Sequence, residues 1–437
     1  MGLRLRAGFA LALAGAALAA APSIPAQNSE GGPLDSLAKP VERVQLLDKP
    51  SQPPAFSVPV EPLGFSAPGP FFLGQRNSLA SLDFLDENRL LFTFRVPGLL
   101  RREAGEENKR QIRALVLTLP AGTVEAEALW TVHDRARYLW MLKDGHFLLR
   151  NRDNLALGDA TLALKPYLHF PGPLLSLEMD PSQQFLVAYS HEPAAEAQKP
   201  AESSGSASAA ASENEDGKEP VTKSEMVVRI LRRDSGRVLL ASRASAAVHL
   251  PINDDGYMES LRGRGDQWLL NLKYYSGGST VLGKVNSVGS PGIDFITPQE
   301  MLVSTFPATG GCELVAMGTD GRHLWEYQTF KAMAWPLLVR APDGSRLAWE
   351  ALALDPSISI STFGPEDVKG QLVEVLNAAD GKVALSAPAR PPLDAGGNVA
   401  ISPSGRRVAM LNGGKIQVFE LPPAPPLPKI GAYPPGR

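Results

Sequence analysis

The sequence predicts an all-β fold: a β-propeller of about seven four-stranded antiparallel blades, in which an N-terminal strand closes the last blade. Three observations lead to this prediction. Turn-forming residues are abundant, with 40 Gly and 39 Pro among 437 residues, which favours turn-rich β-structure over helical bundles. Two strand–turn–strand patterns alternate along most of the chain. The last unit lacks one strand, and a spare strand-like segment lies near the N-terminus.

The composition is that of a globular protein with no strong charge. The chain has 43 Lys and Arg against 46 Asp and Glu, a formal charge of −3, so no nucleic-acid partner is expected. The single cysteine, Cys312, excludes an intrachain disulfide and a cysteine-based zinc or iron–sulfur site. Cys312 lies in an apolar run, which predicts a buried thiol.

The N-terminal segment 1–26 has the pattern of a signal peptide. Arg4 and Arg6 precede an apolar run, residues 7–21, which is shorter than the roughly 20 residues needed to span a bilayer. Small residues follow, and cleavage is expected after Ala19 or Ala26. The alternatives are an N-terminal membrane anchor or an amphipathic helix. The signal peptide predicts an exported protein, periplasmic or secreted, with no transmembrane segment after cleavage.

Three further segments differ in composition from the rest of the chain. Residues 27–54 are rich in Pro, Ser and charged residues and predict a flexible linker. Residues 192–223 contain no aromatic side chain and predict a disordered insertion within the propeller, which is assigned to residues 55–421. Residues 422–437 are rich in proline and predict an extended, unpacked tail.

The first repeated pattern is an apolar strand, a turn, and a second apolar strand. Its clearest copies are residues 177–188, 338–349 and 399–410, the last of which reads VAISPSGRRVAM. Pro fixes φ in the turn, Asp or Ser bonds back to the main chain, and Gly takes the positive-φ position.

Weaker copies of this pattern bring the total to seven. They cover residues 82–94, 138–149, 257–270 and 293–304. Propeller blades typically take ~40–50 residues each, so seven copies predict seven blades. The turns of the seven copies are anchored at Asp86, Lys143, Pro181, Gly263, Pro298, Pro342 and Pro403.

The second pattern is an alternating strand, a turn containing Gly followed by Lys or Arg, and a further strand. It covers residues 226–240, 312–325 and 371–385. A glycine turn between two apolar runs is a strong hairpin signal. One copy of each pattern therefore gives a blade of four antiparallel strands.

The ends of the repeated region predict how the ring closes. The last unit supplies only three strands, residues 398–402, 407–412 and 415–421, before prolines end it. Residues 56–60 are the candidate for the missing outermost strand, which would join the two ends of the ring.

These units, above all the turn at residues 403–405, resemble the WD40-like and YVTN-like β-propeller repeats of exported bacterial proteins. The resemblance covers most of residues 55–421 as a degenerate pattern, and no Trp-Asp dipeptide ends a blade. Residues 320–326 look like one repeat of the pyrroloquinoline quinone dehydrogenases, but the adjacent cysteines of those enzymes are absent. The resemblance implies the propeller fold, and the missing cysteines argue against quinone chemistry.

No catalytic, cofactor-binding or metal-binding residue is assigned from the sequence, and no cofactor is expected. No two of the histidines stand four residues apart, so a metal site would have to be assembled from separate blades. Residues 253–256 (NDDG) are rich in oxygen ligands but lack the distal Glu of a calcium loop, which favours a solvated turn. The six histidines are His133, His146, His169, His191, His249 and His323.

Two surface motifs have alternative interpretations. Residues 274–278 (YYSGG) pair two aromatic side chains with a flexible turn and form a candidate binding surface. Strand alternation gives the alternative of one buried and one exposed tyrosine. Residues 264–266 spell the adhesion tripeptide RGD, for which a plain turn is expected.

The sequence therefore predicts an exported, monomeric β-propeller that acts as a binding or scaffolding module. Its expected partner is a protein, a small molecule or a glycan bound on one face of the propeller, where loops gather. The alternative is an extracytoplasmic enzyme on the same scaffold, of quinoprotein, lyase or glycosidase type. Carboxylates or histidines converging at a channel mouth would favour the enzyme, and a broad apolar or aromatic face would favour the binding module.

Overall fold

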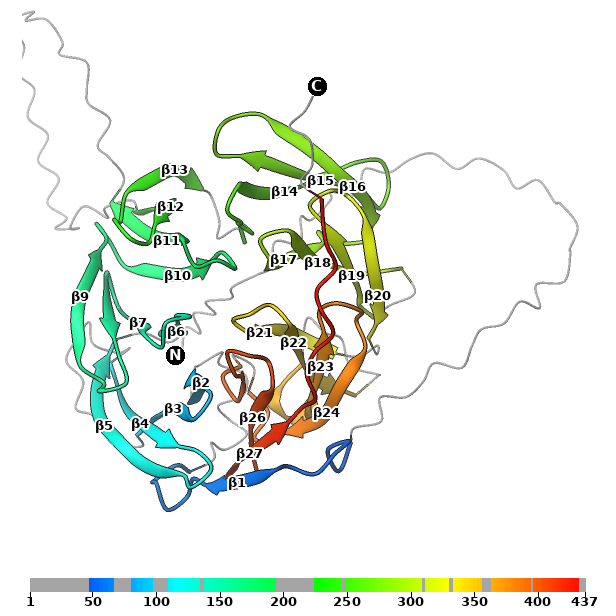
Figure 1. The fold of residues 1–437 in the computed structure, drawn as a ribbon. Coiled ribbons are helices and arrows are strands. Elements are labelled where there is room, and N and C mark those ends of the chain that lie inside the picture. Colours follow the sequence, from blue (N-terminus) through cyan, green and yellow to red (C-terminus); the bar gives the residue numbers. More distant parts are fainter. Residues whose placement is uncertain are drawn as a thin grey trace, which may run out of the picture.

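The computed structural model of the chain is a ring of seven antiparallel sheets, arranged as the blades of a propeller (Figure 1). It describes residues 47–66, 80–96, 109–133, 137–193, 224–244, 249–308, 311–329, 333–355, 363–393 and 396–431. Six sheets have four strands and one has three. The prediction of an all-β, seven-bladed propeller is confirmed.

Blades one to three come from the N-terminal half of the chain. In each, the chain moves outward from the first strand to the fourth, so the first strands surround the centre of the ring (Figure 1). The strands are β2 (Ala80–Asp86), β3 (Arg89–Arg95), β4 (Arg110–Thr118) and β5 (Thr123–Val132) in blade one; β6 (Leu139–Met141), β7 (Phe147–Asn151), β8 (Asn154–Gly158) and β9 (Leu164–His169) in blade two; and β10 (Leu174–Met179), β11 (Phe185–Pro193), β12 (Ser224–Arg232) and β13 (Val238–Ala244) in blade three.

Blades four to seven follow in the same order around the ring. Their strands are β14 (Gly256–Arg262), β15 (Gln267–Tyr274) and β16 (Ser279–Asn286) in blade four; β17 (Gly292–Thr297), β18 (Glu300–Thr305), β19 (Glu313–Gly318) and β20 (His323–Gln328) in blade five; β21 (Met333–Arg340), β22 (Arg346–Leu354), β23 (Val368–Asn377) and β24 (Val383–Ala389) in blade six; and β25 (Val399–Ile401), β26 (Arg407–Asn412), β27 (Lys415–Glu420) and β1 (Phe56–Pro59) in blade seven.

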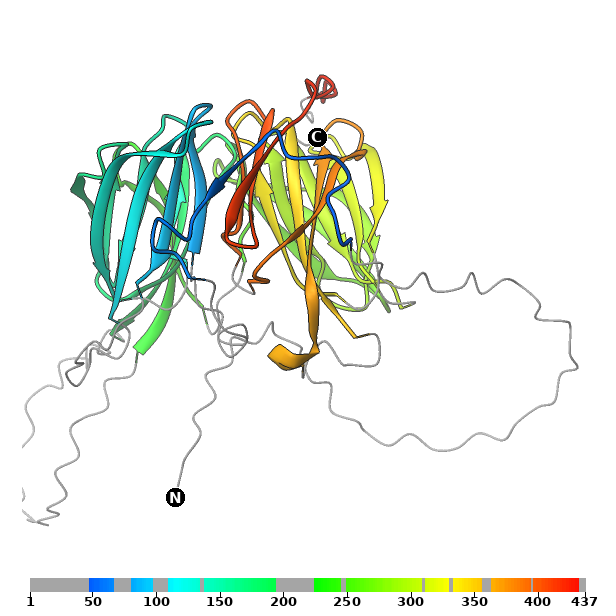
Figure 2. The ribbon, with the colours of Figure 1, turned by 90° about the horizontal axis from the view of Figure 1, so that it is seen from below.

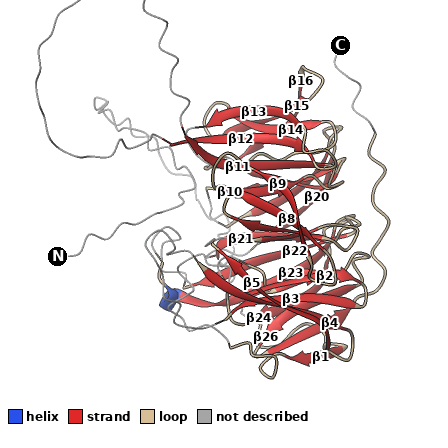
Figure 3. Cartoon of the chain, turned by 90° about the vertical axis from the view of Figure 1, so that its left-hand side faces the viewer, coloured by secondary structure: helices blue, strands red, loops and turns tan. Residues whose placement is uncertain are grey.

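Helix is nearly absent from the part of the chain that the structure describes. It amounts there to a single 3-10 turn, Pro365–Asp367 (Figure 3). No helix among the described residues has the length and apolar character needed to cross a membrane.

Blade four departs from the sequence prediction. Its innermost position is taken by residues 249–252, which reach β14 through a bridge between Ile252 and Tyr257 and a hydrogen bond from Met258 N to Pro251 O at 2.9 Å. Pro251 has no N–H to donate, which weakens this pairing. The first turn of the blade is therefore residues 253–256, and the anchor predicted at Gly263 is wrong: Gly263 begins the turn between β14 and β15.

The N-terminal strand closes the ring as predicted. β1 pairs antiparallel with β27, with Phe56 opposite Val418 and Val58 opposite Ile416. Val58, Ile416 and Val418 are buried in one cluster between blades seven and one. Closure in this form leaves blade seven with four strands, three from the C-terminal end and one from the N-terminal end.

Apolar side chains fill the spaces between neighbouring blades. The second strands are buried on both faces, as in β3, where every residue from Leu90 to Phe94 is buried. The outer strand β5 alternates between exposed and partly buried residues over most of its length. Cys312 is buried between blades five and six, as predicted, and burial raises the pKa of its thiol to about 12.

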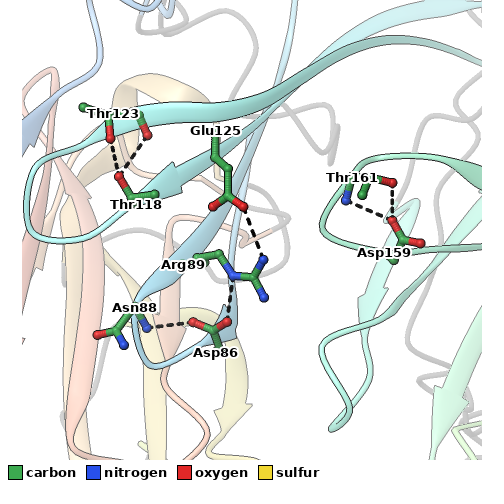
Figure 4. A network of polar contacts seen from close by, with 8 residues as sticks. All are labelled: Asp86, Asn88, Arg89, Thr118, Thr123, Glu125, Asp159 and Thr161. Carbon is green, nitrogen blue, oxygen red and sulfur yellow. Dashed lines mark hydrogen bonds and ion pairs between the residues drawn. The ribbon is translucent and has the colours of Figure 1, made fainter.

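Local turn chemistry explains the hairpins. Asp86 Oδ1 accepts a hydrogen bond from Asn88 N at 2.8 Å, and Asp159 Oδ1 accepts one from Thr161 N at 2.9 Å (Figure 4). Asp343 Oδ1 does the same for Ser345 N at 2.9 Å, and Gly344 between them has a φ of 75°. These are the Asp and Gly roles that the sequence predicts for the turns.

The chain ends are bonded to the ring where the structure describes them. Ser51, within the predicted linker, donates its N–H to Ser386 O of β24 at 2.8 Å. Residues 422–431 run across blades six and five on the rim opposite the short helix (Figure 2), and Arg322 Nη2 donates to Lys429 O at 2.7 Å. Leu427 packs against the core between these blades, so the prediction of an unpacked tail is wrong for these residues.

The other predicted segments lie mainly outside the described residues. Residues 1–26 and the first part of the predicted linker are not among them. Of the predicted insertion 192–223, the structure describes Glu192 and Pro193, which extend β11 and pair with Glu225 and Ser224 of β12. The remainder of that insertion lies outside the described residues.

Candidate functional site

The central channel is the place where ionisable side chains from different blades meet. Six of the seven blades carry such a group on or next to their innermost segment, and these groups interact electrostatically across blade boundaries. We call them the channel charges: Asp83, Arg137, Glu178, His249, Asp294 and Arg340.

His249 is held between the innermost strands of blades three and five. Its Nδ1 lies 2.9 Å from Glu178 Oε2, and its Nε2 lies 2.7 Å from Ile293 O and 3.7 Å from Asp294 Oδ1. Burial lowers the pKa of His249, but Glu178, Asp294 and the carbonyl outweigh it and raise the pKa to about 10. The ring is thus an imidazolium with both nitrogens engaged, and neither is free to accept a proton.

Arg340 links three blades across the channel. From the end of β21 in blade six, Nη1 donates to Phe295 O of blade five, and Nη2 donates to Met179 O of blade three at 3.3 Å. Burial lowers the pKa of its guanidinium, and Arg137 lowers it further while Asp294, Asp180 and Glu178 raise it. Both terminal nitrogens therefore bond main-chain oxygens rather than a carboxylate.

Arg137 and Asp83 face each other from blades two and one. Arg137 Nε donates to Leu139 O at 2.9 Å, and the guanidinium lies 5.6 Å from the ring centroid of Trp140. The side chain is solvent-accessible, yet partial desolvation by the surrounding residues lowers the pKa of its guanidinium. Asp83 accepts a hydrogen bond from Ser81 Oγ at 2.5 Å, and burial raises the pKa of Asp83 to about 6.

Glu350 approaches the same group from blade six. It is 1% exposed, Gln371 Nε2 donates to its Oε2 at 2.9 Å, and its Oε1 is buried with no partner among the described residues. Burial raises the pKa of Glu350 to about 8, although Arg137 and Gln371 lower it. At neutral pH the group is therefore mainly a protonated carboxyl, with an O–H that can donate a hydrogen bond.

A second pair of carboxyl groups lies at the first turns of blades three and four. Asp180 is fully buried, and its oxygens accept hydrogen bonds from Phe185 N at 2.6 Å and Ser182 N at 2.9 Å. Burial raises the pKa of Asp180, and contact with Asp254 raises it further. Because Asp180 is closed off from solvent and bonded to its own turn, we assign it to turn structure.

The channel charges are not singled out by the sequence. Each lies in a run that otherwise has the pattern of an ordinary inner strand, and no spacing along the chain reveals which residues face one another across a ring. The one available signal is the presence of charge inside apolar strand patterns, as at Glu178 in LLSLEM and Asp294 in GIDFIT. Charged residues are rarely buried unless paired.

The histidines and the oxygen-rich turn considered for metal binding are not brought together. Among the described residues, no group of three His, Cys, Asp or Glu side chains has the arrangement of a metal site. Residues 253–256 form a tight turn in which Asn253 Oδ1 accepts from Asp255 N at 3.0 Å and from Gly256 N at 2.9 Å. His249 alone of the six histidines joins the channel charges.

The two surface motifs are placed as follows. Tyr274 packs toward blade five and Tyr275 toward blade three, where it lies 5.3 Å from Phe185 between ring centroids. Both tyrosines therefore pack between blades and do not form a shared binding surface. Residues 264–266 are an exposed turn between β14 and β15.

Known proteins resemble this chain in structure, but the comparisons assign it to no family. No family model matches the sequence, and no curated protein matches it. The chain is similar to Pyrococcus horikoshii acylaminoacyl peptidase, with 12% identity and a TM-score of 0.44 over 76% of this chain and 49% of the peptidase. This chain thus spans about half the length of that protein.

Two further solved structures are similar over nearly their whole length. The β-propeller domain of the trilobed protease from Pyrococcus furiosus has 12% identity and a TM-score of 0.41, with 79% of this chain and 94% of that chain covered. Kuenenia stuttgartiensis hydrazine synthase has 10% identity and a TM-score of 0.40, with 82% of this chain and 96% of that chain covered. At these identities the likeness concerns the fold alone. The chain's own seven sheets make it a seven-bladed β-propeller.

Proposed function

We propose that this chain is an exported binding module that holds a small polar ligand in its central channel. The observation that carries the proposal is the Arg137 guanidinium next to the innermost strand of blade two, whose terminal nitrogens have no hydrogen-bond partner among the described residues. The side chain is solvent-accessible, so these donors can be reached by a ligand. A guanidinium forms strong charge-assisted hydrogen bonds with ligand oxygens, which would supply affinity for a polar ligand.

Export and repeat class belong to the same proposal. The basic, then apolar, then small-residue pattern of residues 1–26 supports a cleaved signal peptide. The Pro-Ser-Gly and Pro-Asp-Gly first turns support membership among the WD40-like and YVTN-like repeats of exported bacterial proteins. Protein made in an exporting host should begin at Ala20 or Gln27 by intact mass, and a full-length mass in the cytoplasm would contradict export.

An enzyme on the same scaffold is the second candidate, and one observation favours it. Glu178, His249 and Asp294 converge in the channel, as catalytic groups do. Against catalysis, both nitrogens of His249 are engaged and its pKa is about 10, far above the range useful to a general base at neutral pH. The convergence is therefore better explained as an ion pair that fixes three inner segments.

One experiment separates the two candidates. Ligand-free protein is incubated with a small-molecule extract, freed of unbound material by gel filtration, and analysed by native mass spectrometry before and after denaturation. A binding module retains a molecule that is recovered unchanged, and an enzyme releases a converted one. Absence of any added mass, with the ring folded by circular dichroism, would refute channel binding.

A further inference from the structure

The C-terminal tail, residues 422–431, lies on the rim of blades six and five with the burial pattern of a polyproline II helix (Figures 1 and 2). None of its residues belongs to a helix or a strand. Every third residue before Ile430, namely Pro423, Pro426 and Lys429, is exposed, and the residues between them are half-buried. A polyproline II helix has three residues per turn and no internal hydrogen bonds, so one side of the tail faces the ring along this length.

Two apolar side chains on that side anchor the tail. Leu427 packs against the cluster between blades five and six that contains Trp325 and Ala378. Ile430 follows three residues later and lies over Gly318 at the end of β19, where a Cβ would stand 3.0 Å from Ile430 Cγ2. Gly318 therefore leaves the space that Ile430 uses, and the two anchors are spaced by one turn of the tail.

The hydrogen bonds of the tail go to its main chain. Arg322 Nη2 donates to Lys429 O at 2.7 Å, and Asp320 Oδ2 holds the same guanidinium by accepting from its Nε at 2.6 Å. Arg346 Nη2 donates to Pro422 O at 2.6 Å. Carbonyl oxygens are common to all peptides, and prolines have no N–H that docking would leave unpaired. The rim therefore selects an extended chain with two correctly spaced apolar anchors rather than one complete sequence.

We propose that this rim is a docking groove for an extended, proline-rich peptide of a partner protein, with the pattern Leu-Pro-x-Ile, and that residues 424–431 occupy the groove in the free chain. The tail pairs with no strand, so it can leave without opening any sheet. Recognition of preformed polyproline II segments costs little ordering entropy. The groove contains none of the channel charges, so the inference stands apart from the proposed channel ligand.

A partner protein suits the groove better than a second copy of this chain. A second copy offers the same tail and gains nothing over the chain's own, which is present at an effective concentration in the millimolar range. A partner segment can add contacts on either side of the shared pattern. Dimers of the unmodified chain on size-exclusion chromatography that disappear when the anchors are replaced would assign the groove to a second copy and overturn the partner assignment.

The first test frees the groove within the full chain. The double variant Leu427→Ser, Ile430→Ser, called the tail-released chain, is titrated by fluorescence anisotropy with a labelled peptide of residues 422–431. We expect it to bind the peptide at least about tenfold more tightly than the unmodified chain does, because the attached tail no longer competes. Equal binding by both chains, or no binding by a tail-released chain that is folded by circular dichroism, would overturn the proposal.

Changes in the peptide test the anchors. A peptide with Ile430→Ser should bind the tail-released chain at least about tenfold more weakly, because it loses a buried apolar side chain. A peptide with Lys429→Gln, changed at an exposed position whose carbonyl is the bonded group, should bind as well as the original. Equal affinities of the two changed peptides would contradict recognition by spaced anchors.

Changes in the ring place the peptide on blade five. Arg322→Gln in the tail-released chain should weaken peptide binding several-fold, because the donor to the Lys429 carbonyl is lost. Arg237→Gln, which removes the same charge from an exposed turn of blade three, should leave binding unchanged. Equal losses in both variants would show an unspecific charge effect and refute the groove.

A second measurement needs no change in the protein. Trypsin cleaves after Lys429, whose carbonyl is held by Arg322, so a docked tail should be cut slowly. An excess of the Lys429→Gln peptide, which trypsin does not cut there, should speed this cleavage several-fold by displacing the tail, as followed by intact mass. The same peptide with Ile430→Ser should not. Cleavage at one rate under all three conditions would show that the tail does not exchange.

Discussion

At the scale of single residues, Glu350 is the clearest case of a carboxyl group whose ionised form is destabilised by folding. Its side chain is 1% exposed and one oxygen has no partner among the described residues. Burial raises its pKa from 4.5 to about 8. The folded chain thus binds a proton that the unfolded chain releases above pH 4.5, so this group lowers stability as pH rises from about 4.5 to about 8.

Replacing Glu350 by Gln should therefore stabilise the protein. Gln keeps an oxygen for the Gln371 hydrogen bond and has no charge to lose. The gain in the free energy of unfolding should be small at pH 4.5 and grow to the order of 3 kcal/mol at pH 8. Urea unfolding at both pH values measures it. The exposed Glu326→Gln variant is the control, and a gain that is equal at both pH values would contradict the burial argument.

His249 gives the opposite case, a base whose charge is favoured by folding. Its folded pKa of about 10 exceeds its ordinary value of 6.5, so its contribution to stability is fully present below pH 6.5 and is lost as pH rises toward 10. Its side chain is 47% exposed, so solvent screening limits the contribution to about 1 kcal/mol.

The variant His249→Gln should accordingly be less stable than the unmodified chain at pH 6, with the difference shrinking toward pH 10. Thermal unfolding across this range measures it. The control is His323→Gln on the outer strand β20, where the His323 imidazole pairs with Glu326. It should change stability much less. A stability difference between His249→Gln and the unmodified chain that grows with pH would show that His249 is not an imidazolium in the folded protein.

At the scale of elements, β1 is the strand on which ring closure depends. It covers the outer edge of β27, and the segment behind it buries Val60 and Phe65 against blade one. A chain that begins at Ser66 exposes that edge, which invites pairing with other chains, and should aggregate on size-exclusion chromatography. A chain that begins at Leu47 retains these contacts and should remain monomeric.

A peptide of residues 47–66 added to the shortened chain distinguishes a missing strand from a misfolded ring. If blade seven is otherwise formed, the peptide should bind and restore cooperative unfolding. A shortened chain that is already monomeric and equally heat-stable would show that β1 does not close the ring.

The C-terminal tail is the second element that spans blades. Leu427 packs into the core between blades five and six, and the carbonyls of Pro422 and Lys429 accept hydrogen bonds from Arg346 and Arg322. Deleting residues 424–437 should lower the free energy of unfolding by about 2 kcal/mol, measured by denaturant titration. Deleting only residues 432–437 is the control, and equal stability of the two deletions would assign the tail no structural role.

The sequence predicts the strands and turns better than it predicts which side chains of different blades lie near one another. Six of the seven turn anchors fall in the first turn of a blade, because Pro, Asp and Gly act through local backbone chemistry. The first turn of blade four is misplaced because Pro251 interrupts its inner segment, which hides the strand pattern before residues 253–256. The channel charges could not be predicted, because which residues face one another across the channel depends on how the separate blades are arranged in space. The spacing of residues along the chain does not encode that arrangement.

At the scale of the whole molecule, both chain ends span several blades. The N-terminal end bonds blade six through Ser51 and Ser386, completes blade seven, and reaches blade one, where Arg113 Nη1 donates to Leu63 O at 2.8 Å. The C-terminal tail spans blades six and five. Together the ends hold four consecutive blades: five, six, seven and one.

This arrangement makes a rearranged chain feasible. Phe56 lies opposite Val418 in the ladder between β1 and β27, so a short linker after Leu421 can lead directly into β1 as a hairpin. A circular permutant with this link and with new ends between Phe65 and Ala80 should fold as a monomer with the same blades, measured by circular dichroism and size-exclusion chromatography. An aggregated permutant would show that the order of the strands in the chain matters to closure.

The closing strand also fixes an order of events during synthesis. Gln52 and Glu420, which are hydrogen-bonded in the finished ring, stand 368 residues apart in the chain, and bringing ends that far apart together costs about 5 kcal/mol in chain entropy. A ribosome makes β1 before β2 to β26 and makes β27 after them, so β1 waits without its partner while every other blade is synthesised. Closure therefore follows the synthesis of β27, and a chain stopped before β27 would remain an open ring.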